Sequence, residues 1–392
     1  MRKVRRVAVV GAGLGGLAAT IALRQQGFEV DVFEQAPELG EFGAGINVSP
    51  NAVRVFEALG LLPRLHDASF QPSGIAWRDW KEGRLQKVLP LNTAQSGGSY
   101  YVIHRVDLHR ILAESCPASD LHLNKRCTQV ELRNGSVGLS FADGTSHEAE
   151  LVIGCDGIRS FVRKSVFGGE GPRYAGTMCW RSLVPVEALP PDHQDGNVTQ
   201  WGGVGGFVIS YKVRQGQFVN IVAVRRHAAW AEESWSVPST NQELVQAFPE
   251  VGPHVGELLR QAKHCTKWGQ FTGEHAAQWT KGRVTLLGDA AHAMLATFGQ
   301  GACMAFEDSY VLAKWLGENR DDPEHALAGY EAVRKPRASR VQSLSRTEVA
   351  FKNISSPVQR LKRQLTYLAR HGSTPEQAYK WMFDYDPVTQ WH

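Results

Sequence analysis

The glycine pattern near the N-terminus constrains the fold more than any other feature of this chain. An apolar, β-branched run at residues 7–10 is followed by a glycine turn, a helical stretch at residues 17–26 and a second strand at residues 30–34. The turn carries three glycines in the spacing G-x-G-x-x-G, namely Gly11, Gly13 and Gly16. The first permits a tight turn, the second lets the backbone approach a pyrophosphate, and the third lets helix and strand pack closely. The pattern therefore predicts a β-α-β unit that binds a dinucleotide.

The end of the second strand carries the acid that such a unit needs. Glu34 lies at the distance from the glycines where a carboxylate accepts hydrogen bonds from ribose hydroxyls, and Gln35 follows it. We therefore assign both residues to the cofactor site. A tight turn without a ligand is the alternative, but the strand, the helix and the acid together favour the binding site. Because flavin and nicotinamide dinucleotides share this unit, it does not tell them apart.

Composition and charge restrict the classes of partner. The formal charge of +4 arises from 43 basic and 39 acidic side chains without long blocks of one sign, so we expect no nucleic acid. No apolar run approaches about 18 residues, and the glycines of the first segment argue against a secretory signal, so we expect a cytoplasmic protein without a membrane span. The six cysteines lack metal-ligand spacing, which indicates free thiols and no metal.

Two later motifs separate flavin from nicotinamide. They are ELVIGCDGIRSFVR at residues 150–163 and GRVTLLGDAAHAM at residues 282–294, each a strand that ends in Gly-x-Asp-Gly or Gly-Asp. Both resemble fingerprints of the single-component FAD-dependent aromatic hydroxylases, which have the p-hydroxybenzoate hydroxylase fold. The resemblance extends over nearly the whole chain and is greatest to the salicylate, 3-hydroxybenzoate and 6-hydroxynicotinate hydroxylases. It implies that Asp156 and Asp289 bind FAD, and that Asp156 and Arg159 also meet the nicotinamide cofactor.

The patterns along the chain and this resemblance predict an α/β fold. It combines a Rossmann-like FAD-binding domain with an interleaved mixed β-sheet substrate domain and a C-terminal helical segment. A hairpin turn is expected at Asp143 and Gly144, and a long helix from Gly301 to Asn319. The expected boundaries are residues 1–70, 100–170 and 270–350 for the FAD-binding domain, residues 71–99 and 171–269 for the substrate domain, and residues 351–392 for the helical segment.

Three further segments resemble cofactor-binding parts of this family. GAGINVSPNAV resembles the loop that touches flavin and substrate, and HRVDL resembles the segment whose arginine binds the cofactor. The residues after Asp289 resemble the loop over the flavin ring, where helix amides stabilise negative charge on reduced flavin. The FAD contacts implied by these segments are Gly45, Arg105, Gly299 and Gly301. For Arg105, an ion pair with Asp107 or Glu114 is the alternative.

The resemblance also implies the chemistry. FAD reduced by NADH or NADPH adds dioxygen to give a hydroperoxide, whose distal oxygen is attacked by an electron-rich ring. The implied substrate is a small phenolic or hydroxypyridine carboxylate, with or without loss of the carboxylate. Hydroxynicotinate-type relatives place histidines where this chain has Asn47 and Phe207, so the proton acceptor stays open. We assign Tyr211, Asn47 and Gln300 as candidate catalytic residues, although a tyrosine with a reference pKa of about 10 is a poor base.

Candidate substrate-binding residues lie in the aromatic middle of the chain. Arg181 suits a carboxylate through a bidentate pair, and the rings of Trp201 and Phe207 suit the walls of a pocket for a planar acid. Packing in a sheet core and at its rim is the alternative for each of them.

Three interpretations of function remain at this point. The first is the aromatic hydroxylase, and the second is a flavin hydroxylase of another substrate class, such as a purine, a quinolone or a polyketide phenol. The third is a non-catalytic dinucleotide-binding protein. The sequence does not decide between NADH and NADPH, or between a monomer and a homodimer.

Overall fold

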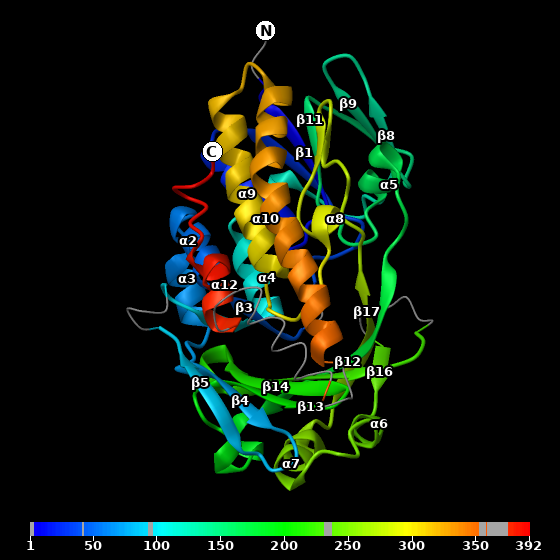
Figure 1. Cartoon of the computed structure of the whole chain (residues 1–392). Coiled ribbons are helices and arrows are strands. Elements are labelled where there is room, and N and C mark those ends of the chain that lie inside the picture. Colours follow the sequence, from blue (N-terminus) through cyan, green and yellow to red (C-terminus); the bar gives the residue numbers. More distant parts are fainter. Residues whose placement is uncertain (1–3, 41–42, 93–96, 231–236, 353–357, 359–374) are drawn as a thin grey trace.

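A computed structural model describes residues 4–40, 43–92, 97–230, 237–352, 358 and 375–392. Its main parts are two large sheets. Long helices gather around the first sheet, and the second sheet lies across the opposite end of the molecule (Figure 1). The α/β class predicted from the sequence is confirmed.

The first sheet has six strands in the order β18-β19-β11-β1-β2-β7. Neighbouring strands from β19 to β7 pair in parallel, and β18 pairs antiparallel at the edge. The central strands are almost continuous apolar runs, because helices cover a parallel sheet on both faces. The strands are β1 (Arg6–Val10), β2 (Glu29–Phe33), β7 (Leu121–His122), β11 (Leu151–Gly154), β18 (Thr280–Lys281) and β19 (Val284–Leu286).

Helix α1 (Leu14–Gln25) follows the glycine turn and packs against α9 (Gly301–Glu318). Small residues let the two helices approach closely, since a Cβ atom at Gly15 would lie 3.2 Å from the Cβ atom of Ala305. The Ser309 hydroxyl also donates a hydrogen bond of 3.0 Å to the Gly15 carbonyl oxygen. Helix α9 agrees with the predicted helix to within one residue, and α10 (Pro323–Lys352) runs beside it (Figure 1).

A small antiparallel sheet has the order β10-β9-β8. Its strands are β8 (Cys127–Leu132), β9 (Val137–Phe141) and β10 (Ser146–Ala149). The predicted turn between the last two is confirmed, with Gly144 at a φ of 82° and the Asp143 carboxylate accepting from the Thr145 amide at 3.0 Å. Glycine reaches this left-handed conformation without steric cost.

The second sheet has eight strands in the order β16-β17-β12-β15-β14-β13-β4-β5. It is mixed, because β13 pairs in parallel with β4 while the other pairs are antiparallel. The early segment 71–99, which is expected in the substrate domain, contributes β4 and β5 to this sheet. The strands are β4 (Gly74–Asp79), β5 (Leu85–Pro90), β12 (Arg173–Pro185), β13 (Val198–Gly203), β14 (Gly206–Val213), β15 (Phe218–Arg226), β16 (Val237–Ser239) and β17 (Cys265–Thr272).

The two faces of this second sheet pack against different partners. Side chains alternate between the faces along each strand. One face, which includes Trp180, Trp201 and Val208, packs with Leu244 of α6 (Asn241–Gln246) and Leu258 of α7 (Pro253–Gln261). The opposite face carries the side chains that turn toward the first sheet, among them Cys179, Phe207, Tyr211 and Trp268.

A two-stranded ribbon connects the two halves. Strand β3 (Gly45–Val48) pairs antiparallel with β6 (Tyr101–His104), and the Gly45 amide donates a 2.7 Å hydrogen bond to Oδ1 of Asn220 on β15. Among the described residues, the other α-helices are α2 (Pro50–Ala58), α3 (Leu62–Ala68), α4 (Arg105–Glu114), α5 (Phe161–Phe167), α8 (Asp289–His292) and α12 (Pro375–Asp384).

The predicted C-terminal helical segment is described only in part. Helix α12 lies within it and packs against α2, while residues 353–357 and 359–374 lie outside the described residues. Where the structure is described, none of the helices combines the length and the apolar character needed to cross a bilayer.

Candidate active site

The glycine turn after β1 leaves room for a phosphate group at one position and excludes side chains at two others. Gly11 has a φ of 105°, and a Cβ atom there would lie 2.5 Å from the Cys155 carbonyl oxygen. A Cβ atom at Gly16 would overlap the Gly11 carbonyl oxygen. At Gly13, by contrast, no atom lies within 4 Å of a Cβ position. The first turn of α1 carries neither an acidic residue nor a capping side chain, so its amides and the open space at Gly13 suit a pyrophosphate.

Glu34 is held at the carboxyl end of β2. Its Oε2 atom accepts a hydrogen bond from the Ala12 amide at 2.8 Å, and its Oε1 atom accepts from the Ala36 amide at 2.9 Å. These bonds orient the carboxylate over the glycine turn, and the neighbouring Gln35 is exposed. Each carboxylate oxygen has further lone pairs, so this arrangement fits a ribose that donates from its hydroxyls.

The two aspartates of the later motifs have different surroundings. Asp156 lies just before α5, whose N-cap residue is Ser160; its Oδ1 accepts from the Ser160 hydroxyl at 2.5 Å and its Oδ2 accepts from the Val162 amide at 3.0 Å. Burial raises the pKa of the Asp156 carboxyl, and these hydrogen bonds oppose that rise. Asp289 opens α8 and is exposed to solvent, yet desolvation by the protein around it raises its pKa. An exposed carboxylate at the start of a helix can accept hydrogen bonds from a ligand.

Arg105 lies between the two parts of the site. It opens α4, and its amide donates to the Ala44 carbonyl oxygen at 2.8 Å. Its positive charge opposes the desolvation that raises the pKa of Asp289, and it adds to the burial that lowers the pKa of Arg181 on the second sheet. Asp107 pairs with Arg214 at 2.8 Å and with Arg110 at 3.5 Å.

Arg181, on β12, lies on the face of the second sheet that turns toward the first sheet. Its guanidinium stacks on the indole of Trp268, with Cζ 3.5 Å from the ring centroid. Burial lowers its pKa, and its Nε atom has no hydrogen-bond partner among the described residues. Arg181 also forms no ion pair with any described carboxylate. Cys179 and Phe207 belong to the same apolar cluster as Trp268, and burial raises the pKa of the Cys179 thiol to about 12.

Tyr211 lies where the second sheet meets β3. A Cβ atom at Gly45 would overlap the Tyr211 ring, so this glycine is what lets the tyrosine approach. Burial raises the pKa of Tyr211 well above its usual value, and the same holds for Tyr100, which lies close enough for the two phenols to influence each other. Both tyrosines therefore keep their protons at neutral pH, and a protonated phenol is able to donate a hydrogen bond. Tyr100 carried no motif, and only the fold brings it here.

Both polar atoms of the Gln300 side-chain amide form hydrogen bonds within the protein. Its Nε2 donates to the Ser49 hydroxyl at 2.8 Å, and its Oε1 accepts from Nδ2 of Asn51 at 3.0 Å. Asn47 packs against Gly299, which has a φ of 66°, and Gly301 opens α9. The predicted residues of the two loops are thus brought together, with Gln300 as part of their support.

Trp201 does not reach this site. It pairs with Val208 across β13 and β14, and both side chains lie on the opposite face, in the cluster with α6 and α7. Its ring is 2% exposed and lies near His193 and His254. The prediction that Trp201 binds substrate needs correction. Successive side chains of a strand point to opposite faces of the sheet, and the position of Trp201 in β13 puts its ring on the face that packs with α6 and α7.

The fold and the site define a dinucleotide-binding flavoprotein whose second sheet closes over the cofactor end of the first. The sequence profile described as "FAD binding domain" matches residues 5–345. Together with the relatives below, this match shows that the chain belongs to the family of FAD-dependent aromatic-ring monooxygenases. It uses FAD with NAD(P)H as co-substrate, which excludes the interpretation as a non-catalytic protein.

Relatives and solved structures agree over almost the whole chain. The chain is 38% identical to a 3-amino-4-hydroxybenzoate 2-monooxygenase of Streptomyces platensis, with 91% of each chain covered. It is 36% identical to a 6-hydroxynicotinate 3-monooxygenase of Pseudomonas fluorescens, over 91% of this chain and 94% of that one. The structure of Klebsiella pneumoniae HpxO complexed with FAD and uric acid superposes with a TM-score of 0.85 at 28% identity, covering 97% and 96% of the two chains.

Proposed function

We propose that the substrate of this monooxygenase is a small aromatic carboxylate with a hydroxyl group on its ring. The observation that carries the proposal is Arg181, a closely surrounded guanidinium that stacks on Trp268 and has no carboxylate partner among the described residues. A substrate carboxylate supplies the missing charge. The relatives named for hydroxybenzoates and hydroxynicotinate support the same class.

The surroundings of Arg181 favour an anionic ligand on energetic grounds. Burial disfavours its charged form, so the free protein bears a desolvation cost that an ionised partner offsets. A carboxylate matches the guanidinium fork with two parallel hydrogen bonds, worth about 1.5–3 kcal/mol for a charged pair. Trp268 fixes the plane of the fork, so the bound ring takes a defined orientation.

Residues of the first sheet and its loops would hold FAD. When bound, FAD supplies the two-electron chemistry by which NAD(P)H reduces dioxygen and one oxygen atom enters the ring. The glycine turn and the amides of α1 would bind the pyrophosphate, Glu34 the ribose, and Asp289 the ribitol. The remaining proposed contacts are Gln35, Gly45, Arg105, Asp156, Gly299 and Gly301. This assigns residues 1–70, 100–170 and 270–350 to FAD, and residues 71–99 and 171–269 to the substrate.

Tyr211 would orient the substrate hydroxyl. Because burial raises its pKa, it holds its proton at neutral pH and donates a hydrogen bond to the ring oxygen. Such a bond stabilises the developing phenolate, which makes the ring more nucleophilic. Phe207 and Cys179 line the same face with apolar surface and exclude water from the reacting ring.

A substrate panel tests this proposal. The purified protein is loaded with FAD and given 3-amino-4-hydroxybenzoate, 3-hydroxybenzoate, salicylate, 6-hydroxynicotinate or urate, while NAD(P)H oxidation, oxygen uptake and hydroxylated product are measured. We expect product from at least one carboxylate and much less from its matched carboxamide. Equal turnover of acid and amide, or product from urate alone, would contradict the proposal and favour the heterocycle hydroxylase. Oxidation that yields only peroxide marks an effector.

A further inference from the structure

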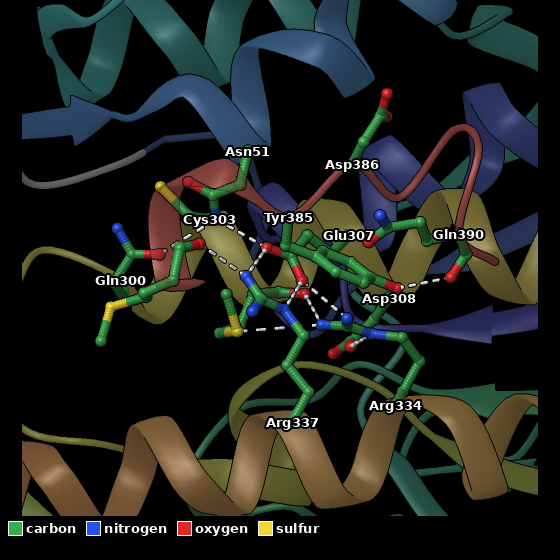
Figure 2. A network of polar contacts seen from close by, with 12 residues as sticks. Asn51, Gln300, Cys303, Glu307, Asp308, Arg334, Arg337, Tyr385, Asp386 and Gln390 are labelled. Carbon is green, nitrogen blue, oxygen red and sulfur yellow. Dashed lines mark hydrogen bonds and ion pairs between the residues drawn. The ribbon is translucent and has the colours of Figure 1, made fainter. Parts of the chain in front are cut away.

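Asn51, at the start of α2, connects three side chains in the interior. It is fully buried, and its Oδ1 accepts from the Ser49 hydroxyl at 2.6 Å. Its Nδ2 donates to Oε1 of Gln300 at 3.0 Å and to Oε1 of Glu307 at 2.6 Å. Figure 2 shows Asn51 with its partners Gln300 and Glu307; Glu307 lies on α9, and Gln300 is the residue before its first turn. The Asn51 amide therefore donates to two acceptors along α9, one on Gln300 just before the helix and one on Glu307 in its second turn.

The first of these contacts closes a ring of hydrogen bonds around the Gly299–Gly301 turn. Gln300 also donates to the Ser49 hydroxyl, so Asn51, Ser49 and Gln300 bind one another in a cycle. Cys303 adds a contact of 3.5 Å from its thiol to the Asn47 carbonyl oxygen on β3. The turn that precedes α9 is thus joined to the end of β3 through side chains.

The second contact joins Asn51 to a buried cluster of charges. The Glu307 carboxylate receives hydrogen bonds of 2.7 and 2.8 Å from Nε and Nη2 of Arg337 and forms an ion pair of 2.6 Å with Arg334. Arg334 also binds Asp308, at 2.8 Å. Two carboxylates thus face two guanidiniums, and removal of one member leaves an uncompensated charge away from water.

The cluster continues into the C-terminal helix. Arg337 donates to the Met382 carbonyl oxygen at 2.7 Å and lies over the Tyr385 ring, with Cζ 4.0 Å from its centroid (Figure 2). Arg54 of α2 donates to the carbonyl oxygens of Phe383 and Tyr385, each at 3.0 Å. The two arginines satisfy carbonyls at the end of α12, so this helix docks on the same network.

We propose that Asn51 is a positioning residue, which holds the Gly299–Gly301 turn and Asn47 in register with the charge cluster and α12. A neutral amide is required there, because one side needs a donor to an amide oxygen and the other a donor to a carboxylate. The inference rests on the proposed function in one respect, namely that this turn faces the flavin. Asn51 acts through Gln300 and Glu307 and touches neither cofactor nor substrate.

Replacement of Asn51 by aspartate tests the donor directly. Asn51→Asp keeps the shape and the acceptor for Ser49, but when ionised it opposes Glu307 and loses both donated bonds. We expect weaker FAD binding by about tenfold and less product per NAD(P)H, both worsening as the pH rises from about 6 to about 9 and the introduced carboxyl group ionises. The native protein should show no such pH dependence. FAD affinity and the visible flavin spectrum are measured without aromatic substrate, so a wrong substrate assignment leaves this part of the test intact.

Two further variants complete the design. Asn241→Asp on α6 is the matched control, because Asn241 also donates twice from Nδ2, to the carbonyl oxygens of Leu259 and Ala262, but far along the chain from the turn. We expect its FAD affinity and product yield to equal those of the native protein. In the double variant Asn51→Asp/Glu307→Gln the net charge is restored and residue 307 becomes a donor, so the pH dependence should flatten.

The outcome that overturns the proposal is equally defined. If Asn51→Asp and Asn51→Ala both match Asn241→Asp in FAD affinity, flavin spectrum and product yield across this pH range, Asn51 has no positioning role. If Asn51→Ala fails to fold, the pH dependence of Asn51→Asp decides alone, since a purely structural loss lowers the melting temperature without a pH-dependent change in product yield.

Discussion

Nε2 of His292 lies 2.5 Å from Oδ2 of Asp308, and both side chains are almost completely removed from solvent. Burial alone would raise the pKa of Asp308, but His292 and Arg334 lower it, so the carboxylate is ionised and His292 donates. The same oxygen accepts from the Gly288 amide at 3.2 Å, immediately before Asp289. Asp308 thereby positions the turn that presents Asp289, and His292 is part of this support.

Loss of the Asp308 charge should destabilise the whole FAD-binding part. Asp308→Asn leaves Arg334 with one carboxylate fewer in a buried site, which costs about 3–5 kcal/mol of unfolding free energy. Urea unfolding of the protein without FAD, followed by tryptophan fluorescence, measures the change. Asp143→Asn removes an exposed pairing with Lys125 and should change stability little. A similar small effect for both variants would contradict this role of Asp308.

Arg181→Gln should affect substrate and spare cofactor. We expect kcat/KM for the carboxylate substrate to fall by about 10- to 100-fold, because a charge-assisted pair is lost, while FAD affinity stays unchanged. Arg181→Lys should recover only part of the loss, since lysine lacks the planar fork that stacks on Trp268. Arg225→Gln is the control, because Arg225 lies on β15, the strand next to that of Arg181, and pairs with Glu250. Equal losses in both arginine variants would argue against a carboxylate site.

The variant Tyr211→Phe tests whether Tyr211 acts as a hydrogen-bond donor or as a base. Because burial raises the pKa of Tyr211, the native pH profile should show no ionisation of this group below about pH 10, and the variant should keep that profile. The yield of hydroxylated product per NAD(P)H should fall as the ring oxygen loses its donor. A limb that is present in the native profile and lost in the variant would instead assign Tyr211 to proton transfer, and an unchanged yield would remove it from the mechanism.

Alanine substitutions of two glycines in the first turn should distinguish an effect on folding from an effect on FAD binding. Gly13→Ala places a methyl group in open space, so the protein without FAD should melt as the native protein does but bind FAD more weakly. Gly16→Ala places its methyl group against the Gly11 carbonyl oxygen and should lower the melting temperature itself. Melting curves with and without FAD distinguish the two. Native FAD affinity in Gly13→Ala would argue against a pyrophosphate at this position.

Acid should destabilise the second sheet through its buried histidines. Desolvation, with the neighbouring His254, lowers the pKa of His193 below 6.5. The folded protein therefore binds this proton less readily than the unfolded chain, and stability is lost as the pH falls below about 6.5 toward the folded pKa. Calorimetry of His193→Gln, whose amide can still reach the His254 carbonyl oxygen, should show a smaller fall in melting temperature on acidification. An identical fall would place the effect elsewhere.

Motifs with short spacing were predictable from the sequence. The glycine turn, Glu34 and the start of α9 depend on residues close together in the chain, and the structure places them as local rules require. Trp201 shows where such reasoning ends, because a strand residue changes face with a shift of one position and no motif reports the register. The sequence did not place Asn51 and Tyr100 at the site, because the contacts that bring them there, to Gln300 and to Tyr211 respectively, join residues more than a hundred positions apart.

The sequence by itself determined the class of fold, the flavin cofactor and the family of reactions. The class of fold follows from backbone positions that only glycine can occupy and from an acid at a set distance, which are local features of the sequence. The flavin cofactor and the family of reactions follow from the resemblance carried by the two later motifs. Tertiary structure alone decided which charges lack partners and which polar groups are tied up: Arg181 faces the site with no described carboxylate beside it, whereas Gln300 is held by Ser49 and Asn51. The reason is that desolvation and pairing depend on every atom that surrounds a group, and only the packed chain brings those atoms together.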